Sequence, residues 1–365
     1  MKIALIYNFA QHYRTNIFTL MDKELDVDFY FGDHYQNVKK MDYSLLTHKV
    51  TEVKNVHIGP LVWQANTVRL VWGKYDTFIM LGEPKCISSW VILILSRLLG
   101  KRFIFWTHGW YGRENWIKKI VKKIYFGLAD GVMLYGEYAR NLMLKQGLPS
   151  DKLFVIHNSL AYDEEIKVRQ GLEPSTFYQV HFNNDNSNLV FIGRLIADKK
   201  LDLIIHAMVL LRNKGINLNM TYVGDGPVKA NLETLAKDCD LQDHVWFYGP
   251  CYDETKIAQL IYNADICVSP GDIGLTAIHS MTFGTPVITH NNFCHQGPEF
   301  EAIQENITGL FFEYNNTEDL AHAIMQWLEK HHEDREKVRQ ACYKEIEEKW
   351  NPHKQLETIK KVIMA

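Results

Sequence analysis

Two basic side chains follow one apolar run in the second half of the chain. The run Leu189–Gly193 ends directly before Arg194, and Lys199 comes five residues after that arginine. A guanidinium and an ammonium close to the start of the next helix suit a diphosphate, because fixed cations and backbone amides both favour concentrated negative charge. The alternative is a pair of solvated cations at an ordinary helix start.

Glycine-bearing turns follow two further apolar runs. Gly224 lies in the turn Val223–Pro227, and Gly274 precedes the helix expected from Leu275 onward. Glycine permits tight backbone geometry and lets a ligand approach the main chain. His279 lies four residues after Leu275, about one helical turn, so it can face the same ligand. The alternative is a buried histidine that packs against the sheet.

The segment after the first apolar run contains no glycine. Asn8–Arg14 follows Ile3–Tyr7, and a dinucleotide fold needs small residues at this point so that the pyrophosphate can approach the backbone. An NAD or FAD enzyme is therefore not expected. Tyr13 and Arg14 are candidates either for binding a substrate or for capping a helix as an ordinary surface pair.

These residues need elements that position them, and apolar runs alternate with helix-length segments in both halves of the chain. Many runs are apolar on consecutive residues, which indicates strands covered on both faces, and the intervening helices imply parallel sheets. The predicted strands are Ile3–Tyr7, Val27–Phe31, Thr77–Leu81, Arg102–Trp106, Gly131–Tyr135, Leu153–His157, Leu189–Gly193, Asn219–Val223, Val245–Tyr248, Ile266–Pro270, Pro286–Thr289 and Gly309–Glu313. The pattern predicts an α/β fold with two tandem doubly wound, Rossmann-like domains.

A polar, turn-rich stretch over residues 160–188 separates the two halves, and Trp350–Pro352 interrupts the last helical segment. We therefore expect an N-terminal domain over residues 1–165, a C-terminal domain over 166–345 and a closing helix over 346–365.

The composition describes a folded and nearly neutral protein. Of the 365 residues, 47% are hydrophobic and 23% are charged, and the formal net charge is −3. A uniformly basic nucleic-acid binder is excluded, so nucleic acid is not an expected partner. The longest apolar run, Val91–Leu95, is too short to cross a bilayer. The six cysteines form no C-x-x-C pair, which favours reduced thiols and a cytoplasmic location.

The charge is unevenly spread, since residues 1–165 carry +5 and the remainder carries −8. The segment Arg113–Phe126 has apolar residues at helical spacing and lysines on its other face. These lysines are Lys118, Lys119, Lys122 and Lys123. Such a helix suits an anionic lipid surface, which predicts a peripheral contact with the inner face of the cell membrane. The alternative is an ordinary amphipathic surface helix.

An ordered set of motifs occupies residues 189–330. The motifs are Phe191–Leu195 with Lys199, Tyr222–Pro227, Val245–Gly249, Asn263–Pro270, Gly284–Ile288 and Asn306–Phe312. This set resembles the donor-binding half of the family-4 retaining glycosyltransferases, which are group 1 enzymes of the GT-B fold. Trp106–Gly109, Leu153–Ser159 and Trp350–Pro352 are similar to the family at lower specificity.

The resemblance implies an architecture and an activity. Two Rossmann-like domains would face each other across a cleft, with the acceptor on the N-terminal domain, the nucleotide-sugar on the C-terminal domain and the closing helix crossing back to the N-terminal domain. A sugar would pass, with retention, from a UDP or GDP sugar to a saccharide or lipid-linked acceptor in cell-surface polysaccharide biosynthesis. Two alternatives remain: a nucleotide-sugar epimerase of the same fold, and a non-catalytic nucleotide-sugar-binding partner.

The resemblance also implies roles for single residues. The catalytic residues would be Arg194, Lys199 and His108. The donor-binding residues would be Gly193, Gly224, Asp225, Gly271, Asp272, Gly274, Leu275, Thr276 and His279. The acceptor-binding residues would be His12, Tyr13 and Arg14. No Asp-x-Asp pair lies in a suitable loop, so neither a metal nor a cofactor is expected.

The sequence departs from the family at two positions. Gly271 and His279 stand where the family has two glutamates. The usual carboxylate contact to the donor ribose is therefore missing, and a neutral His279 is expected to accept one hydrogen bond and donate another. Asp272 is a candidate to replace the acid that is missing at position 271.

Overall fold

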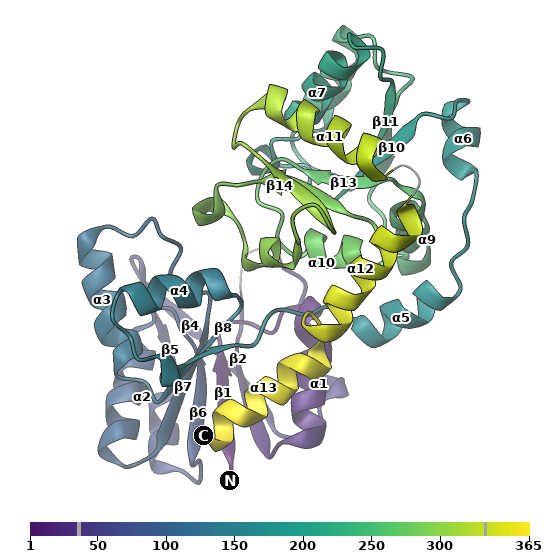
Figure 1. Cartoon of the computed structure of the whole chain (residues 1–365). Helices are drawn as coiled ribbons and strands as arrows, with labels where there is room; N and C mark the ends of the chain where they lie inside the picture. Colours follow the sequence, from purple (N-terminus) through teal and green to yellow (C-terminus); the bar gives the residue numbers. More distant parts are fainter. Residues whose placement is uncertain (35–37, 332–333) are drawn as a thin grey trace. The chain divides into compact units, whose positions relative to one another are not determined.

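The apolar runs predicted as strands form two parallel sheets, one in each of two units of the chain (Figure 1). The computed structural model describes residues 1–34, 38–331 and 334–365. Unit 1 consists of Met1–Ala161 together with Asn351–Ala365, and unit 2 consists of Tyr162–Trp350. The α/β fold class with two doubly wound sheets is confirmed. The predicted domain boundaries, after residues 165 and 345, differ from these by a few residues.

Unit 1 contains a parallel sheet and a separate antiparallel strand pair. Its strands are β1 (Ile3–Tyr7), β2 (Val27–Gly32), β3 (Val50–Val53), β4 (Asn55–Ile58), β5 (Leu61–Gln64), β6 (Thr77–Leu81), β7 (Arg102–Thr107), β8 (Gly131–Leu134) and β9 (Leu153–Val155). The order across the sheet is β3-β2-β1-β6-β7-β8-β9, and β4 pairs with β5.

Helices cover both faces of this sheet. They are α1 (Thr15–Glu24), α2 (Ile87–Leu98), α3 (Trp116–Gly127), α4 (Glu137–Lys145) and α13 (Pro352–Met364), with short 3-10 turns η1 (His12–Arg14), η2 (Tyr43–Leu45), η3 (Val68–Trp72) and η4 (Ser150–Lys152). Successive side chains of a strand point to opposite faces. Ile3, Leu5 and Tyr7 therefore pack with α1 and α13, whereas Ala4 and Ile6 pack with α2, α3 and α4.

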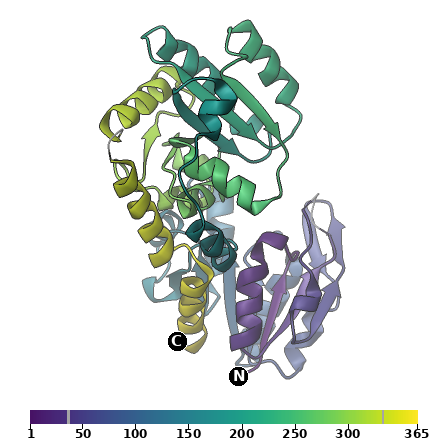
Figure 2. The same cartoon turned by 90° about the vertical axis from the view of Figure 1, so that its right-hand side faces the viewer.

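The closing helix begins at residues whose types predict a helix start. The Asn351 side chain accepts a hydrogen bond from the Lys354 amide at 3.0 Å, and Pro352 occupies the first turn. Gln355 then accepts a hydrogen bond from the Ser159 hydroxyl at 2.7 Å. Figure 2 shows α13 on the α1 side of unit 1, where its apolar residues are part of the core.

Unit 2 repeats the same architecture. Its strands are β10 (Ser187–Ile192), β11 (Leu218–Val223), β12 (Val245–Gly249), β13 (Ile266–Ser269), β14 (Val287–His290) and β15 (Gly309–Phe312), in the order β12-β11-β10-β13-β14-β15. Its helices and 3-10 turns are α5 (Tyr162–Gln170), α6 (Phe177–Phe182), η5 (Ala197–Lys199), α7 (Asp202–Arg212), α8 (Lys229–Asp238), α9 (Glu254–Asn263), α10 (Thr276–Thr282), η6 (Phe293–His295), η7 (Pro298–Ala302), α11 (Thr317–His331) and α12 (Arg335–Glu348). In Figure 1, α7 and α11 lie on one face of this sheet, and α9, α10 and α12 lie on the other.

Three strands of unit 1 were not predicted. β3 is a short edge strand, and β4 and β5 form a largely exposed pair. These segments lack a long apolar run because they pack less surface against a core, so hydrophobic periodicity gives little signal for them. Among the described residues, no helix combines the length and the apolar composition that a bilayer crossing requires.

Both sheets change direction beside their first strand. In unit 1 the chain adds strands outward from β1 through β2 and then restarts on the other side with β6. In unit 2 the same change occurs between β10 and β13. Ligands of doubly wound folds bind at such a point, outside the carboxyl ends of the strands. The fold therefore predicts one binding edge in each unit.

Candidate functional site

At the binding edge of unit 2, the loops after β10 and β11 lie in direct backbone contact. The Gly193 amide donates to the Val223 carbonyl at 3.0 Å, and Gly193 and Gly224 have φ values of 150° and 142°. A Cβ on Gly224 would overlap the carbonyl oxygen of Gly193. Only glycine combines this conformation with this approach. The predicted turn at Gly224 is thus part of a close-packed pair of strand ends.

The loop after β13 packs against the turn that carries Lys199. A Cβ on Gly271 would overlap the carbonyl oxygen of Asp198 and lie 2.7 Å from the Cα of Lys199. The Lys199 ammonium donates a hydrogen bond to the carbonyl oxygen of Asp272. Position 271 therefore has no room for a side chain, which explains why no carboxylate stands there.

Two cations lie together at this edge. The side chain of Arg194 is exposed, and that of Lys199 is partly buried. Burial lowers the pKa of the Lys199 ammonium, and the nearby charge of Arg194 lowers it further, whereas Asp272 and Glu299 act in the opposite direction. The two predicted cations therefore interact through space, and they border the loops that contain Gly193, Gly224 and Gly271.

The Gly274 turn is fixed from behind by a glutamine. The Gln296 side chain accepts from the Ile273 amide at 2.9 Å and donates to the Thr289 hydroxyl at 2.9 Å. Asp272 accepts from the Gly297 amide at 2.6 Å. Gly274 itself has φ of 51°, and a Cβ placed there would meet open space. The turn is thus held rigidly and leaves its front accessible to a ligand.

Several predicted donor-binding residues form hydrogen bonds that stabilise these loops. The Asp225 carboxylate accepts from the Gly226 amide at 2.8 Å and so closes its own turn. The Thr276 hydroxyl donates to the Ile192 carbonyl at 3.1 Å, which ties the start of α10 to the end of β10. Leu275 directly precedes α10. The carboxylate of Asp272 holds the loop at Gly297, so structural support is its observed role.

His279 is paired with glutamates from two other helices. Its Nε2 lies 2.6 Å from a carboxylate oxygen of Glu254, at the start of α9. Glu165 of α5 is 4% exposed, and burial raises its pKa to about 7. Burial alone would lower the pKa of His279, but the hydrogen bond to Glu254 and the charge of Glu165 raise it overall. The hydrogen bond to Glu254 thus favours protonation of His279, whereas the sequence alone led us to expect a neutral ring.

The same three side chains are the only described group whose ligand atoms converge closely enough to hold a metal ion. Atoms of Glu165, Glu254 and His279 lie within 4.8 Å of one another. The proton between His279 and Glu254 already satisfies two of the three groups. We therefore interpret this group as a buried ion network that supports α10.

At the binding edge of unit 1, a cavity of about 590 Å³ opens between the ends of β1 and β6. Tyr13, Arg14 and His108 line it, and the structure thus brings three predicted residues together. His12 is exposed and is not among the lining residues. The His108 ring packs 4.7 Å from the ring of Tyr135.

Arg14 is buried, so only one of its two sequence interpretations conflicts with the structure. It is 5% exposed, so the ordinary surface pair is wrong for this residue. Its guanidinium lies 5.4 Å from the ring of Tyr7, 5.6 Å from that of Trp106 and 5.1 Å from that of Tyr135. Such distances allow cation–π attraction. Arg14 is a buried cation beside a cavity.

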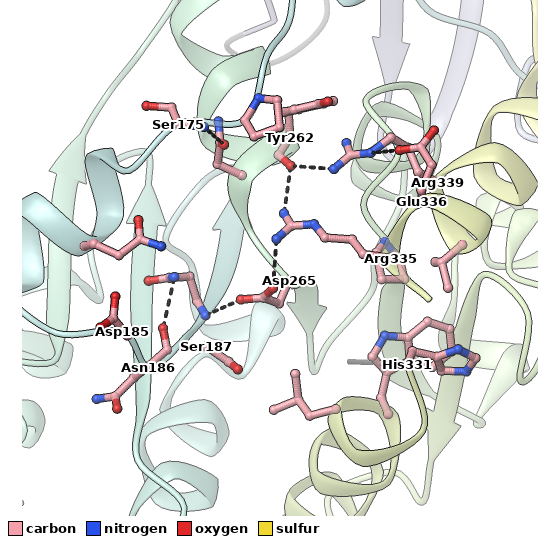
Figure 3. A pocket seen from close by; sticks show the side chains of 18 of the residues that line it. Ser175, Asp185, Asn186, Ser187, Tyr262, Asp265, His331, Arg335, Glu336 and Arg339 are labelled. Atoms are coloured by element: carbon pink, nitrogen blue, oxygen red, sulfur yellow. Dashed lines mark hydrogen bonds and ion pairs between the residues drawn. The ribbon is translucent and has the colours of Figure 1, made fainter. Parts of the chain in front are cut away.

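Unit 2 has a hollow of about 630 Å³ at the edge of its sheet opposite Arg194 and Lys199 (Figure 3). Arg335 donates to Asp265 at 3.0 Å and to the Tyr262 carbonyl at 2.9 Å, and Asp265 accepts from the Asn188 amide at 2.7 Å. Figure 3 shows these groups turned toward one another. Because Asp265, Arg335 and Arg339 are paired within the fold and the hollow lies at the amino ends of the strands, we interpret it as a structural feature.

Residues 175–345 match the family model described as "Glycosyl transferases group 1". The matched segment covers the whole of the sheet that carries Arg194 and Lys199. This segment is a group 1 glycosyltransferase domain by that match.

Curated relatives of this group 1 domain are glycosyltransferases by name. EpsD of Bacillus subtilis, named as a glycosyltransferase, is 25% identical over 247 residues, which cover 64% of this chain and 62% of the relative. A GDP-mannose-dependent alpha-(1-6)-phosphatidylinositol dimannoside mannosyltransferase of Mycobacterium tuberculosis is 33% identical over 103 residues, which cover 27% and 26% of the two chains. The matched part of the chain thus spans less than two thirds of the length of these relatives.

Solved structures show that the group 1 domain and unit 1 together adopt the GT-B fold. Anabaena HepE in complex with UDP has a TM-score of 0.72 at 16% identity, with 100% of both chains covered. The lipopolysaccharide outer core galactosyltransferase WaaB has a TM-score of 0.71 at 14% identity, covering 100% of this chain and 99% of that chain.

Some residues of the group 1 domain had no readable signal in the sequence. Gln296 lies in a polar loop, Glu254 follows the helix cap Asp253, and Glu165 is one of three consecutive acids. Nothing in their local sequence separates them from solvated neighbours. Only contacts across the fold connect them to α10 and to the Gly274 turn.

Proposed function

We propose that the chain is a retaining glycosyltransferase. It moves a sugar from a UDP or GDP sugar to a saccharide or lipid-linked saccharide, without a metal or a cofactor, in cell-surface polysaccharide assembly at the cytoplasmic face of the membrane. The family match of residues 175–345 supports the reaction class. The UDP bound in HepE and the GDP-mannose dependence named for the mycobacterial relative support a nucleotide-sugar donor.

The observation that carries this proposal is the cation pair at the binding edge of unit 2. A nucleoside diphosphate gains negative charge as its bond to the sugar breaks. Arg194 and Lys199 supply fixed positive charge for that group, and the glycine contacts at Gly193, Gly224 and Gly271 let it approach the backbone. In this proposal the two cations stabilise the charge of the leaving diphosphate, as a metal ion does in other transferases. Retention follows from the family resemblance, and His108 is proposed to act on the donor sugar.

The test is the double variant Arg194→Ala/Lys199→Ala. Losing two charge-assisted contacts to the leaving group should lower kcat by about a hundredfold or more. It should also remove the thermal stabilisation by UDP or GDP, which is about 2.7 kcal/mol at a ligand concentration of 100 times Kd. The matched control is Arg212→Ala/Lys214→Ala, an arginine and a lysine at the far end of α7.

Three outcomes would contradict the proposal. Unchanged turnover in the double variant would remove the role of the cation pair. A new sugar epimer formed from the donor alone would favour the epimerase. Nucleotide binding without transfer to any saccharide acceptor would favour the non-catalytic partner, which the missing glutamates at Gly271 and His279 suggest.

We also propose that unit 1 contacts an anionic membrane through α3. An ordinary amphipathic helix buries its apolar stripe, but α3 leaves most of it exposed. The exposed fractions are Trp116 71%, Ile117 53%, Ile120 52%, Val121 38% and Ile124 52%. Exposed lysines flank this stripe, so the helix offers both apolar surface and positive charge to a lipid interface.

Vesicle flotation tests this contact. With vesicles of equal parts phosphatidylcholine and phosphatidylglycerol, Lys118→Gln/Lys123→Gln should weaken binding about fivefold for each lysine neutralised. Ile117→Ser/Ile120→Ser should weaken it as well, whereas Val180→Ser/Ile307→Ser, at exposed apolar positions of unit 2, should not. A lipid-induced blue shift that is lost in Trp116→Phe would place α3 in the interface. Equal binding to phosphatidylcholine alone would contradict the charge argument.

A further inference from the structure

The cavity of unit 1 contains a cation without a counter-ion. Within the described residues, the Nε and Nη1 atoms of Arg14 have no hydrogen-bond partner, and no acidic side chain is among the groups that act on its charge. Around the guanidinium lie the phenol groups of Tyr135, Tyr7 and Tyr13, and the Tyr135 hydroxyl is its hydrogen-bonding neighbour, so no carboxylate balances its charge. Burying a guanidinium without a carboxylate costs folding free energy that a bound anion would return.

The same chain segment holds two more unpaired polar groups. Asn8 and Gln11 line the cavity with Arg14, and the side-chain oxygens Oδ1 of Asn8 and Oε1 of Gln11 are buried without a donor. Buried polar groups are normally paired, so unpaired ones beside a cavity point to a ligand that completes them. The guanidinium of Arg14 would pair with an acid group of a ligand, and the two acceptor oxygens of Asn8 and Gln11 would receive hydrogen bonds from hydroxyl groups beside that acid.

Other charges at the cavity leave Arg14 available. Lys122 also lines the cavity, but its ammonium is held by Glu114 at 2.7 Å and by the Gly109 carbonyl at 2.8 Å. Glu83 lies on the exposed rim. The buried charge that faces the cavity without an acidic partner is therefore the positive charge of Arg14.

We propose that this cavity binds an acidic saccharide, whose carboxylate or phosphate pairs with Arg14 and whose hydroxyls donate to Asn8 and Gln11. The acceptor role of this ligand rests on the proposed function, but its binding does not. A guanidinium pairs with either acid in a planar, two-point geometry, which gives the preference over a neutral sugar.

Binding is tested on the full chain without nucleotide. Glucuronate probes the carboxylate, glucose 1-phosphate probes the phosphate, and glucose is the neutral reference. At least one acid should bind about tenfold or more tightly than glucose by calorimetry, and Arg14→Met should abolish that difference. Gln11→Met should weaken all three sugars alike. If neither acid binds more tightly than glucose, the proposal is wrong.

Nucleotide binding distinguishes two possible anions at Arg14, an acidic saccharide and the diphosphate of the nucleotide-sugar. Arg14→Met should leave UDP and GDP binding unchanged, because those ligands are assigned to Arg194 and Lys199. If Arg14→Met weakens nucleotide binding and acidic sugars do not bind, the diphosphate of the donor is the anion and the proposal is overturned. Loss of nucleotide binding in Arg194→Ala/Lys199→Ala tests the proposed function separately.

A matched control separates a ligand-binding arginine from a structural one. Arg339 is also 5% exposed, but it donates to the carbonyls of Phe283 and Tyr262, both at 3.3 Å. Arg339→Met should lower the melting temperature clearly, whereas Arg14→Met should leave it unchanged or raise it, because it removes an unpaired buried charge. A large loss of stability in Arg14→Met would show a structural role and contradict the proposal.

Discussion

At the scale of residues, position 279 carries a histidine where the family resemblance implies a glutamate, and side chains distant in the sequence surround it. The imidazole of His279 is held by Glu254, and Glu165 approaches from a third helix. The pKa of each buried group is set by its neighbours, since burial favours neutral forms and opposite charges favour charged ones. The network therefore responds to pH as a unit.

The variant Glu165→Gln tests that network. The pKa of Glu165 is raised from 4.5 to about 7 in the folded chain. Its contribution to stability is fully present below pH 4.5 and is lost as the pH rises through about 7. In the variant, the free energy of unfolding should therefore fall less between about pH 5 and 8, by at most about 3 kcal/mol.

Urea unfolding at a series of pH values measures this difference. The control is Glu164→Gln, an exposed neighbour on the same helix. The pKa of His279 is raised in part by the charge of Glu165, so Glu165→Gln also reduces the His279 contribution, which acts in the same direction above pH 6.5. Parallel pH profiles for the wild type and Glu165→Gln would refute the raised pKa.

At the scale of elements, the ends of neighbouring strands decide which residue types fit the site of unit 2. The loops after β10, β11 and β13 contact one another through backbone atoms at Gly224 and Gly271. The carboxylate that the resemblance places at position 271 is excluded by this packing. Donor binding in unit 2 is therefore expected to use other groups of these loops than a carboxylate at position 271.

The variant Gly271→Glu tests the packing of these loops. The new Cβ would overlap the carbonyl oxygen of Asp198 and crowd Lys199, so the backbone must shift. We expect a loss of about 1–3 kcal/mol in stability and weaker nucleotide binding. Thermal unfolding with and without UDP measures both effects. Gly127→Ala, where a Cβ meets open space, is the control. A stable variant with restored or increased activity would show that this position tolerates the acid.

Helix α3 shows the limit of periodicity at this scale. Its spacing predicts one apolar face, but spacing does not say whether that face meets the core or the solvent. In the structure Tyr125 and Phe126 anchor the helix, and the rest of the stripe is exposed. The choice between the two interpretations of α3 depends on which neighbours the fold brings to it.

At the scale of the whole molecule, unit 1 is assembled from both ends of the chain. Ser159 and Gln355 are hydrogen-bonded across 196 positions of sequence, and α13 completes the core around β1. Each unit has its binding edge where its sheet changes direction. The candidate anion sites of the two units, at Arg14 and at Arg194 with Lys199, lie at these two edges.

The sequence alone determined the two parallel sheets, the cation pair after β10 and the glycine turns, because periodicity and turn chemistry are local properties. It also indicated the start of α13 through Asn351 and Pro352. Only the tertiary structure decided that Arg14 is buried with two unpaired nitrogen atoms and that His279 meets the side chains of Glu254 and Glu165. Burial and pairing depend on residues that are distant in the chain, and no local pattern records them.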